Sequence, residues 1–203
     1  MLNIKALPQS FYLEGDVVDI SKKLLGKIIV TDIDAETTIS RIVETEAYNG
    51  SMDKACHAYP NRKTPRTEVM FKEGGRSYVY LCYGIHYLFN IVTNKENEPN
   101  AVLIRAVEPL RGLDIMENRR KIHNRINLTN GPGKLAGALG ITRNLNDITL
   151  YDSNSSIWLG VEEGGGQDLE IIQTTRVGVD YAEEDALLCW RFYIKDNPYV
   201  SRK

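Results

Sequence analysis

Hydrophobic positions near the start of the chain recur at the spacing of one helix face. Val17, Ile20 and Leu24 share that face. Asp16 precedes them as an N-cap, and Gly26 follows them as a residue that readily adopts the left-handed conformation of a helix end. The pattern therefore predicts a short amphipathic helix whose apolar face packs on the rest of the protein.

Most other hydrophobic segments have the composition and alternation of β-strands. Helical spacing returns over 112–121 and from Asn130 to Gly140, where Pro132 stands early in the predicted helix. The predicted strands cover 27–32, 41–48, 77–93 as a hairpin, 101–107, 157–159, 169–179 and 187–194. Because strands and helices do not alternate in βαβ order, the pattern predicts an α+β fold with a mostly antiparallel sheet, in a single domain over 1–203.

The predicted hairpin reverses direction at an apolar tip. Tyr83, Gly84 and Ile85 lie between its two strands, where hairpins usually carry polar turn residues. One interpretation is that the tip folds back onto the core. The other is that Tyr83 acts as a wedge between stacked bases, as apolar side chains do in proteins that kink DNA from the minor groove.

Two carboxylates fall on one face of a predicted strand. Alternation places Glu44, Glu46 and Tyr48 together on that face. The spacing alone favours a half-exposed strand with solvated carboxylates, because acidic residues lie mostly at the surface. A second interpretation makes one carboxylate a general base beside a bound water. A third, a metal site that adds Asp53 and His57, has no compact ligand motif to support it.

Two polar side chains interrupt otherwise apolar strands. Asn90 lies in the run LFNIV, and Arg105 lies in the run VLIRA. A buried amide needs hydrogen-bond partners, which are either core groups or the edge of a base. A buried guanidinium is usually paired with a carboxylate, and Glu46 is a plausible partner for Arg105.

The composition is that of an ordinary globular protein. The chain has 203 residues, of which 42% are hydrophobic and 26% charged, and its net charge is −2. This charge excludes a protein that is basic all over, although cations cluster at 62–66 and 119–125. Charge runs are usually solvated surface, but two such clusters in loops beside a wedge are also what contact with DNA phosphates requires.

The cellular location is suggested by features that the sequence lacks. No apolar run approaches the ~20 residues of a membrane-spanning helix, and the first residues lack the charged and apolar regions of a secretory leader. Cys56, Cys82 and Cys189 are odd in number and far apart, which argues against a disulfide framework or a zinc knuckle. We therefore expect a cytoplasmic protein without a membrane partner.

Eight segments, in order along the chain, carry a resemblance to a known family. They are ETEAY (44–48), DKACHA (53–58), KTPR (63–66), YVYLCYG (78–84), LIRAVEP (103–109), NGPGKL (130–135), RVGV (176–179) and the stretch from WRF to YVS (190–201). Together they resemble the alkyladenine (3-methyladenine) DNA glycosylase family from about residue 10 to the end of the sequence. Each segment alone is weak evidence, whereas their order and spacing are specific.

The resemblance implies a fold and an activity. The family folds as one mixed domain around a curved antiparallel sheet, from which a β-hairpin protrudes into the minor groove. Its members act in base excision repair as monofunctional hydrolases that flip alkylated purines out of double-stranded DNA and cut the N-glycosidic bond. The implied substrates are 3-methyladenine and 7-methylguanine, with hypoxanthine and ethenoadenine as further candidates. The resemblance implies no metal or cofactor, and we expect a monomer.

The same resemblance implies roles for individual residues. Glu46 corresponds to the general base, and Arg105 corresponds to an arginine beside the attacking water. Tyr83 corresponds to the side chain that fills the gap left by the flipped base. The residues that enclose the flipped base are Tyr48, His57 and Tyr80, with Asn90 crowding the amino group of normal guanine, and those near the DNA backbone or groove are Thr64, Arg66, Ile85 and Lys134.

Two other classes of protein are alternatives. One is a catalytically silent protein that binds damaged DNA with the same fold, which the intact ETEAY segment argues against. The other is a metal-dependent hydrolase that uses Glu44, Glu46 and His57. No lysine stands beside the motif as a nucleophile, so attack by water is favoured over a Schiff-base lyase. The sequence contains no evident acid that would protonate a neutral leaving purine.

Overall fold

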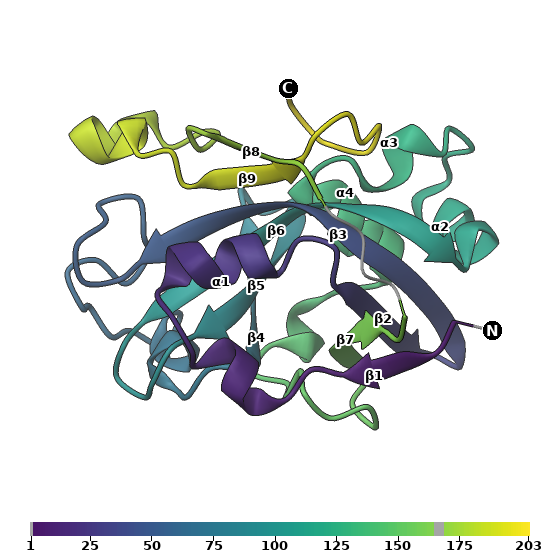
Figure 1. The fold of residues 1–203 in the computed structure, drawn as a ribbon, viewed down its shortest axis with the longest axis horizontal. Helices are drawn as coiled ribbons and strands as arrows, with labels where there is room; N and C mark the ends of the chain where they lie inside the picture. The colour runs from purple at the N-terminus through teal and green to yellow at the C-terminus, as the bar shows by residue number, and fades with distance from the viewer. Residues whose placement is uncertain (1, 165–168) are drawn as a thin grey trace.

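A computed structural model describes residues 2–164 and 169–203 as one α+β domain built on a large sheet (Figure 1). The fold class predicted from the sequence is therefore confirmed. The strands are β1 (Ile4–Ala6), β2 (Ile28–Ile33), β3 (Glu36–Asn49), β4 (Arg76–Cys82), β5 (His86–Thr93), β6 (Asn100–Arg111), β7 (Ile157–Glu162), β8 (Ile171–Thr174) and β9 (Arg191–Ile194). The α-helices are α1 (Val17–Lys23), α2 (Leu113–Arg120), α3 (Ile126–Thr129) and α4 (Pro132–Leu139). Short 3₁₀ helices are η1 (Gln9–Tyr12), η2 (Glu68–Phe71), η3 (Arg143–Leu145) and η4 (Asp180–Leu187).

The long strand β3 is the centre of the sheet. The strand order is β1-β7-β2-β3-β6-β5-β4, and the described pairings are antiparallel, as predicted. β2 pairs with the first part of β3, and β9 pairs with residues 44–46 of β3. The register against β6 shifts between Ile39 and Thr45, which marks the bulges that bend a strand. β3 accordingly sweeps across the molecule, and the sheet stays open rather than closing into a barrel (Figure 1).

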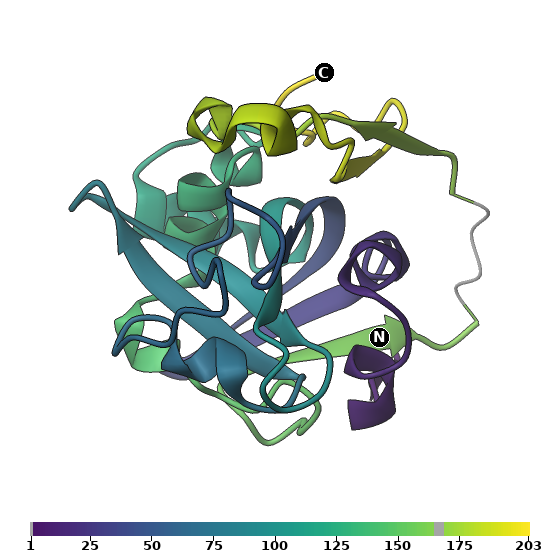
Figure 2. The same cartoon turned by 90° about the vertical axis from the view of Figure 1, so that its left-hand side faces the viewer.

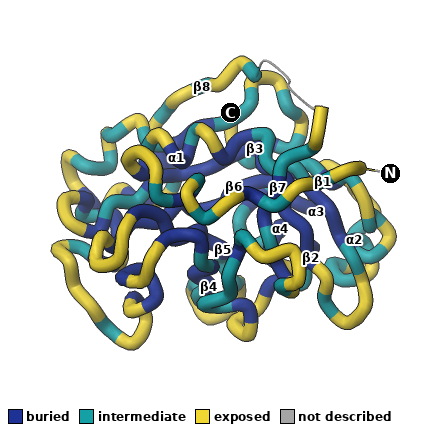
Figure 3. Tube along the Cα trace, turned by 60° about the horizontal axis from the view of Figure 1, so that its bottom comes forward, coloured by how far each residue is buried: buried dark blue, intermediate teal, exposed yellow. Residues whose placement is uncertain are grey.

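The predicted amphipathic helix is confirmed as α1. Its N-cap is Asp16, whose side chain accepts a hydrogen bond from the backbone N–H of Asp19 at 2.8 Å. Val17, Ile20 and Leu24 are buried on its inner face. α1 lies in front of β3 in Figure 1, while α4 lies behind it and packs on β5 and β6. The buried segments of Figure 3 are therefore concentrated in the central strands, between these helices.

The last third of the chain contains less strand than predicted. The strands expected over 169–179 and 187–194 are confirmed only in part, as β8 and β9. After Thr174 the chain leaves the sheet because the Arg176 side chain is drawn into a buried ion pair with Asp53, far away in the sequence. The 3₁₀ helix η4 then lies between this turn and β9, and it overlaps the strand predicted over 187–194 only at Leu187.

The hairpin of β4 and β5 projects from the body of the protein, at the left of Figure 2. Ile85 donates its N–H to the Cys82 carbonyl at 3.1 Å, and the residues between them have positive φ angles of 51° at Tyr83 and 73° at Gly84, as a type I′ turn requires. Tyr83 is 93% exposed and Ile85 is 71% exposed. The interpretation that the tip folds back onto the core is therefore wrong.

Membrane and redox expectations are tested only in part. Among the described residues, no helix has both the length and the apolar composition to cross a bilayer. Cys56, Cys82 and Cys189 carry free thiols. The expected reducing compartment stays a prediction.

The packing of β6 gives a test of the fold. Ile104 is fully buried on this strand, so Ile104→Ala should lower the free energy of unfolding by about 2–5 kcal/mol, the usual cost of a large cavity in a core. Ile126, which is 48% exposed, is the control, and Ile126→Ala should change stability by no more than about 0.5 kcal/mol. Urea unfolding followed by circular dichroism measures both. Equal losses would contradict the described position of Ile104.

Candidate active site

A cavity of about 870 Å³ opens between the hairpin, the loop after β3, α4 and the segment before η4. Most of the residues singled out from the sequence line it: Tyr48, His57, Arg66, Tyr80, Tyr83, Asn90, Arg105 and Lys134. Three others do not. Glu46 is fully buried, Ile85 projects from the hairpin tip, and Thr64 is hydrogen-bonded to Thr67 within its own loop. A volume of this size is typical of a small-molecule site.

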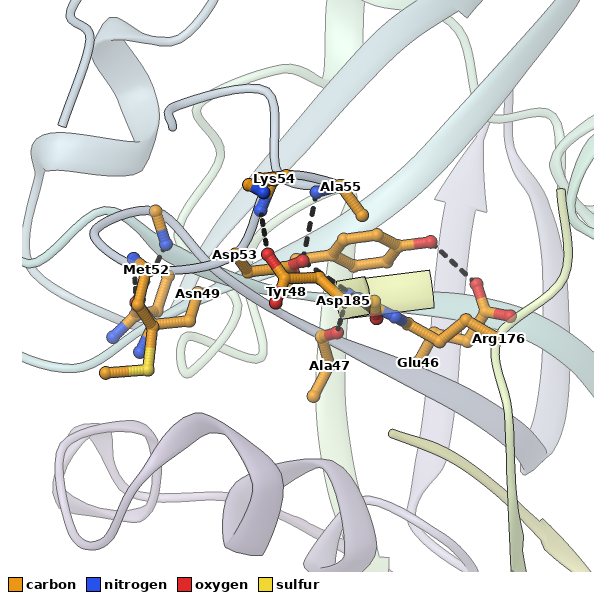
Figure 4. Close-up of polar contacts among 12 residues, drawn as sticks. Glu46, Ala47, Tyr48, Asn49, Met52, Asp53, Lys54, Ala55, Arg176 and Asp185 are labelled. Carbon is orange, nitrogen blue, oxygen red and sulfur yellow. Dashed lines mark hydrogen bonds and ion pairs between the residues drawn. The ribbon is translucent and has the colours of Figure 1, made fainter. Parts of the chain in front are cut away.

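Glu46 lies directly behind the cavity wall. One carboxylate oxygen accepts hydrogen bonds from the Tyr48 hydroxyl at 2.8 Å and lies 3.3 Å from Nη1 of Arg105. The other oxygen accepts the backbone N–H of Val177 at 2.7 Å. Figure 4 shows the hydrogen bond between the Tyr48 ring and this carboxylate. The interpretation of Glu44 and Glu46 as solvated carboxylates is wrong, because both side chains are 0% exposed.

The second carboxylate, Glu44, is held by two guanidinium groups. One of its oxygens accepts from Nε of Arg105 at 3.0 Å and from Nη1 of Arg191 at 2.9 Å. The other accepts the backbone N–H of Ser201 at 2.7 Å. Arg105 therefore contacts both carboxylates, whereas the sequence had suggested Glu46 alone as its partner. Two buried carboxylates thus lie against two buried guanidinium groups, whose attraction offsets part of the cost of removing these groups from water.

A second buried ion pair supports the Tyr48 ring. The guanidinium of Arg176 binds both carboxylate oxygens of Asp53, and the side chains of both residues are fully buried. The guanidinium carbon lies 4.9 Å from the centre of the Tyr48 ring and 5.3 Å from that of Trp190. Burial and the neighbouring Glu46 carboxylate raise the pKa of Tyr48 well above its ordinary value, so its hydroxyl stays protonated and donates to Glu46. In Figure 4 the Tyr48 hydroxyl points to the Glu46 carboxylate, while the Asp53 carboxylate is bonded to Arg176.

His57 forms the opposite part of the cavity wall. Its Nε2 lies 3.3 Å from Nη2 of Arg66, and because a guanidinium only donates, Nε2 must accept. The proton is therefore on Nδ1, which donates to the Tyr78 hydroxyl at 3.0 Å. The ring meets that of Tyr80 edge to face, with centres 4.7 Å apart, and the Arg66 guanidinium lies 4.7 Å from the Tyr80 centre. Burial, followed by the positive charge of Arg66, lowers the pKa of His57 to about 4.

Asn90 has a partner in the core, which is the first of the two roles that the sequence left open, while contact with a base edge stays a prediction. It is 4% exposed, and its amide group donates to the Tyr78 carbonyl at 3.1 Å. Its amide also lines the cavity, and its oxygen accepts no hydrogen bond from the described residues. The side chain is thus fixed by the sheet while one polar atom is available to a ligand.

The cations near the cavity differ in how far they are already engaged. Lys134 donates to the Asn130 side chain at 2.8 Å. Arg119 pairs with Glu36 at 3.1 Å, and Arg120 donates to two backbone carbonyls. All three line the cavity beside the hairpin. The cluster at 119–125 is therefore partly structural and partly directed at the opening of the cavity.

The residues considered for a metal site do not come together as ligands. Within residues 2–164 and 169–203, no three His, Cys, Asp or Glu side chains are grouped as they would be around a metal ion. Glu44 and Glu46 contact guanidinium groups, Asp53 contacts Arg176, and His57 contacts a tyrosine and Arg66. The donor set named from the sequence does not fit a metal ion.

Sequence reasoning missed the side chains that assemble the site from a distance. Asp53 was considered only as a metal ligand and as part of a motif, Arg176 only as part of a motif, and Arg191 and Ser201 were given no role. Local periodicity carries no signal for such contacts, because the partners are separated by more than a hundred residues, as Asp53 and Arg176 are. The one available signal was a charged side chain within an apolar strand, because such a group needs a buried partner. This signal identified Arg105 in the sequence.

Comparison with known proteins agrees with the motifs in the sequence. Residues 10–198 match the sequence profile of the family described as methylpurine-DNA glycosylase (MPG). A protein of Natranaerobius thermophilus is 49% identical over 192 residues, which cover 94% of this chain and 96% of the relative. One of Desulfitobacterium hafniense is 45% identical over 208 residues (98% and 100%), and one of Chlamydia felis is 48% identical over 190 residues (93% and 95%). All three are named "Putative 3-methyladenine DNA glycosylase".

The histidine in the cavity wall gives a test of this geometry. The His57 imidazole should titrate with a pKa of about 4, and Arg66→Gln should raise that value because it removes a neighbouring positive charge. The ordinary pKa of histidine is 6.5, so between pH 6.5 and pH 4 His57 binds more protons in the unfolded chain than in the folded protein. The contribution of His57 to the free energy of unfolding should therefore fall as the pH is lowered from 6.5 towards 4. NMR titration of the ring measures the pKa, with the exposed Arg62→Gln as control. A midpoint that Arg66→Gln leaves unchanged would contradict the contact.

Proposed function

This chain belongs to the methylpurine-DNA glycosylase family and is a DNA glycosylase, and we propose that it is monofunctional and releases alkylated purines that it flips out of double-stranded DNA. The proposed reaction is hydrolysis of the N-glycosidic bond by water. 3-Methyladenine and 7-methylguanine are the proposed substrates, with hypoxanthine and ethenoadenine as further candidates. The observation that carries the proposal is the buried Glu46 carboxylate, held directly behind a cavity with tyrosine walls.

Glu46 suits the role of general base. A carboxylate has about four acceptor positions, and Glu46 accepts hydrogen bonds from Tyr48 and Val177, while Arg105 forms an ion pair with the oxygen that Tyr48 binds. Among the described residues, the oxygen beside Val177 accepts no second hydrogen bond, which leaves it a position for a water molecule. As the bond to the base breaks, the sugar becomes an oxocarbenium-like cation, as in glycoside hydrolysis. The ionised Glu46 stabilises this cation and takes a proton from the water, while Arg105 holds the water from the cavity side.

The walls of the cavity suit a purine. Tyr48 and Tyr80 offer aromatic faces, and stacking on such faces contributes about 1–3 kcal/mol per base. An alkylated purine with a positive charge gains a further cation–π attraction. Asn90 projects a fixed amide into the same space, where it would crowd the exocyclic amino group of an unmodified guanine. These contacts return part of the energy that base flipping costs.

The surface around the opening suits DNA. The exposed tip of the hairpin places Tyr83 where it can enter the stack and fill the gap left by the flipped base. Ile85 lies beside it, and Lys134 lies at the cavity opening, within reach of the DNA backbone. Arg66 and Thr64 belong to the loop that faces the same opening, although Arg66 is already engaged with His57. One copy of the chain holds all of these residues, so we propose that it acts as a monomer.

The role of Glu46 is tested by Glu46→Gln, which keeps the size of the side chain and removes the base. Release of 3-methyladenine from a methylated duplex should fall by about 10²–10⁴-fold, the usual contribution of a general base, while binding to the duplex survives. Glu98→Gln, at an exposed glutamate, is the matched control and should leave release unchanged.

The same experiment separates the alternatives. If the unaltered protein binds methylated duplex and releases no free base, it is a silent binder. If Glu46→Gln releases base at the rate of the unaltered protein, Glu46 is not the general base.

The role of the hairpin tip is tested by Tyr83→Ala. Because Tyr83 is 93% exposed, the melting temperature should change little, whereas affinity for a duplex with a damaged purine should fall at least tenfold, which is ~1.4 kcal/mol. Ile171→Ala, which removes an exposed apolar side chain on β8, should affect neither quantity. Fluorescence anisotropy measures the affinity. A large fall in melting temperature with unchanged affinity would place Tyr83 in the core and refute the wedge.

A further inference from the structure

Arg105 is oriented by contacts on more than one edge of its guanidinium. Its Nε donates to Glu44 at 3.0 Å, its Nη1 lies 3.3 Å from Glu46, and its Nη2 donates to the Ser201 hydroxyl at 3.3 Å. A guanidinium has five N–H groups, so beyond the two hydrogen bonds to described residues three remain, two on Nη1, which lies beside Glu46, and one on Nη2. Arg105 is also one of the residues that line the cavity.

Glu44 is the group that fixes this orientation. It is fully buried, and besides Arg105 it is held by Nη1 of Arg191 at 2.9 Å and by the Ser201 N–H at 2.7 Å. Arg191 is fixed in turn by the carbonyls of Thr175 and Arg202, at 2.9 and 2.7 Å. The side chain of Glu44 therefore has no freedom to follow Arg105 if that side chain rotates.

We propose that Glu44 is a positioning residue for hydrolysis: it holds Arg105 by its Nε edge so that the Nη groups face Glu46 and the cavity. The kinetic part of this inference rests on the proposed function of Glu46. The contact itself does not, because it is defined by the geometry of Arg105 and Glu44 alone.

A second consequence concerns the charges. Two carboxylates at one site repel each other unless positive charges lie beside them. Here Arg105 lies beside both carboxylates, and Arg191 supplies a second guanidinium at Glu44, so the site has as many guanidinium groups as carboxylates.

The direct test is Glu44→Gln in a single-turnover assay of base release. We expect the rate to fall at least tenfold and the affinity for damaged duplex to change less than threefold. Glu108→Gln is the matched control: Glu108 pairs with Arg41 at 3.2 Å across the same two strands, away from the cavity, and the rate should be unchanged.

A double-mutant cycle shows whether Glu44 acts through Arg105. Arg105→Gln should lower the rate at least as much as Glu44→Gln, and the double variant should be no slower than Arg105→Gln alone. Effects that multiply would overturn the inference, as would a folded Glu44→Gln protein with an unchanged rate.

A measurement without substrate separates this inference from the proposed function. In ¹⁵N-labelled protein, the Nε–H of Arg105 should give a resonance protected from exchange, and Glu44→Gln should lower that protection because a neutral amide oxygen is a weaker acceptor than a carboxylate. If Glu44→Gln does not fold, Glu44→Asp keeps the charge but draws the carboxylate away from Nε of Arg105, and it should lower the same protection. Undiminished protection in either folded variant would overturn the positioning role, even if the unaltered protein released no base.

Discussion

The compensation of buried charge beside β3 is the constraint on which the rest of the site depends. Glu44 and Glu46 are both fully buried, and an uncompensated carboxylate at such a position would cost several kcal/mol. The sheet supplies Arg105 from β6, and the last part of the chain supplies Arg191 from β9. The Glu46 carboxylate, behind the cavity wall, is therefore preorganised by strands that lie on both sides of it.

This constraint also explains why the last third of the chain folds as it does. The segment after β8 gives up strand pairing so that Arg176 can bind Asp53 under the Tyr48 ring and Val177 can donate its N–H to Glu46. β9 then returns to pair with β3 along the three residues that carry both carboxylates. The turn at Arg176 and Val177 thus supports the Tyr48 ring in the cavity wall and holds the Glu46 carboxylate in place. The contacts that stabilise the fold here are also those that build the candidate active site.

Local pattern was sufficient to predict α1, most strands, the antiparallel sheet and the hairpin, because periodicity and turn residues act over a few positions. It failed for β1, whose three residues are too short to show alternation, and for 175–179, where a distant ion pair replaces the sheet. Spacing placed Glu44, Glu46 and Tyr48 on one face correctly but suggested solvent around them, because the compensating arginines come from elsewhere in the chain. The cavity residues were reached through the family resemblance, and their roles stay predictions.

The central claim is that the Glu46 carboxylate and the flipped nucleotide meet across the wall formed by Tyr48 and Arg105. The most direct measurement is a crystal structure of the protein bound to a duplex that carries a non-hydrolysable analogue of an alkylated purine nucleotide. The account predicts that the purine lies in the cavity between Tyr48 and Tyr80, with a water held by Glu46 and Arg105 facing the sugar carbon C1′. A purine that stays stacked in the duplex, or a C1′ that faces away from Glu46, would contradict it.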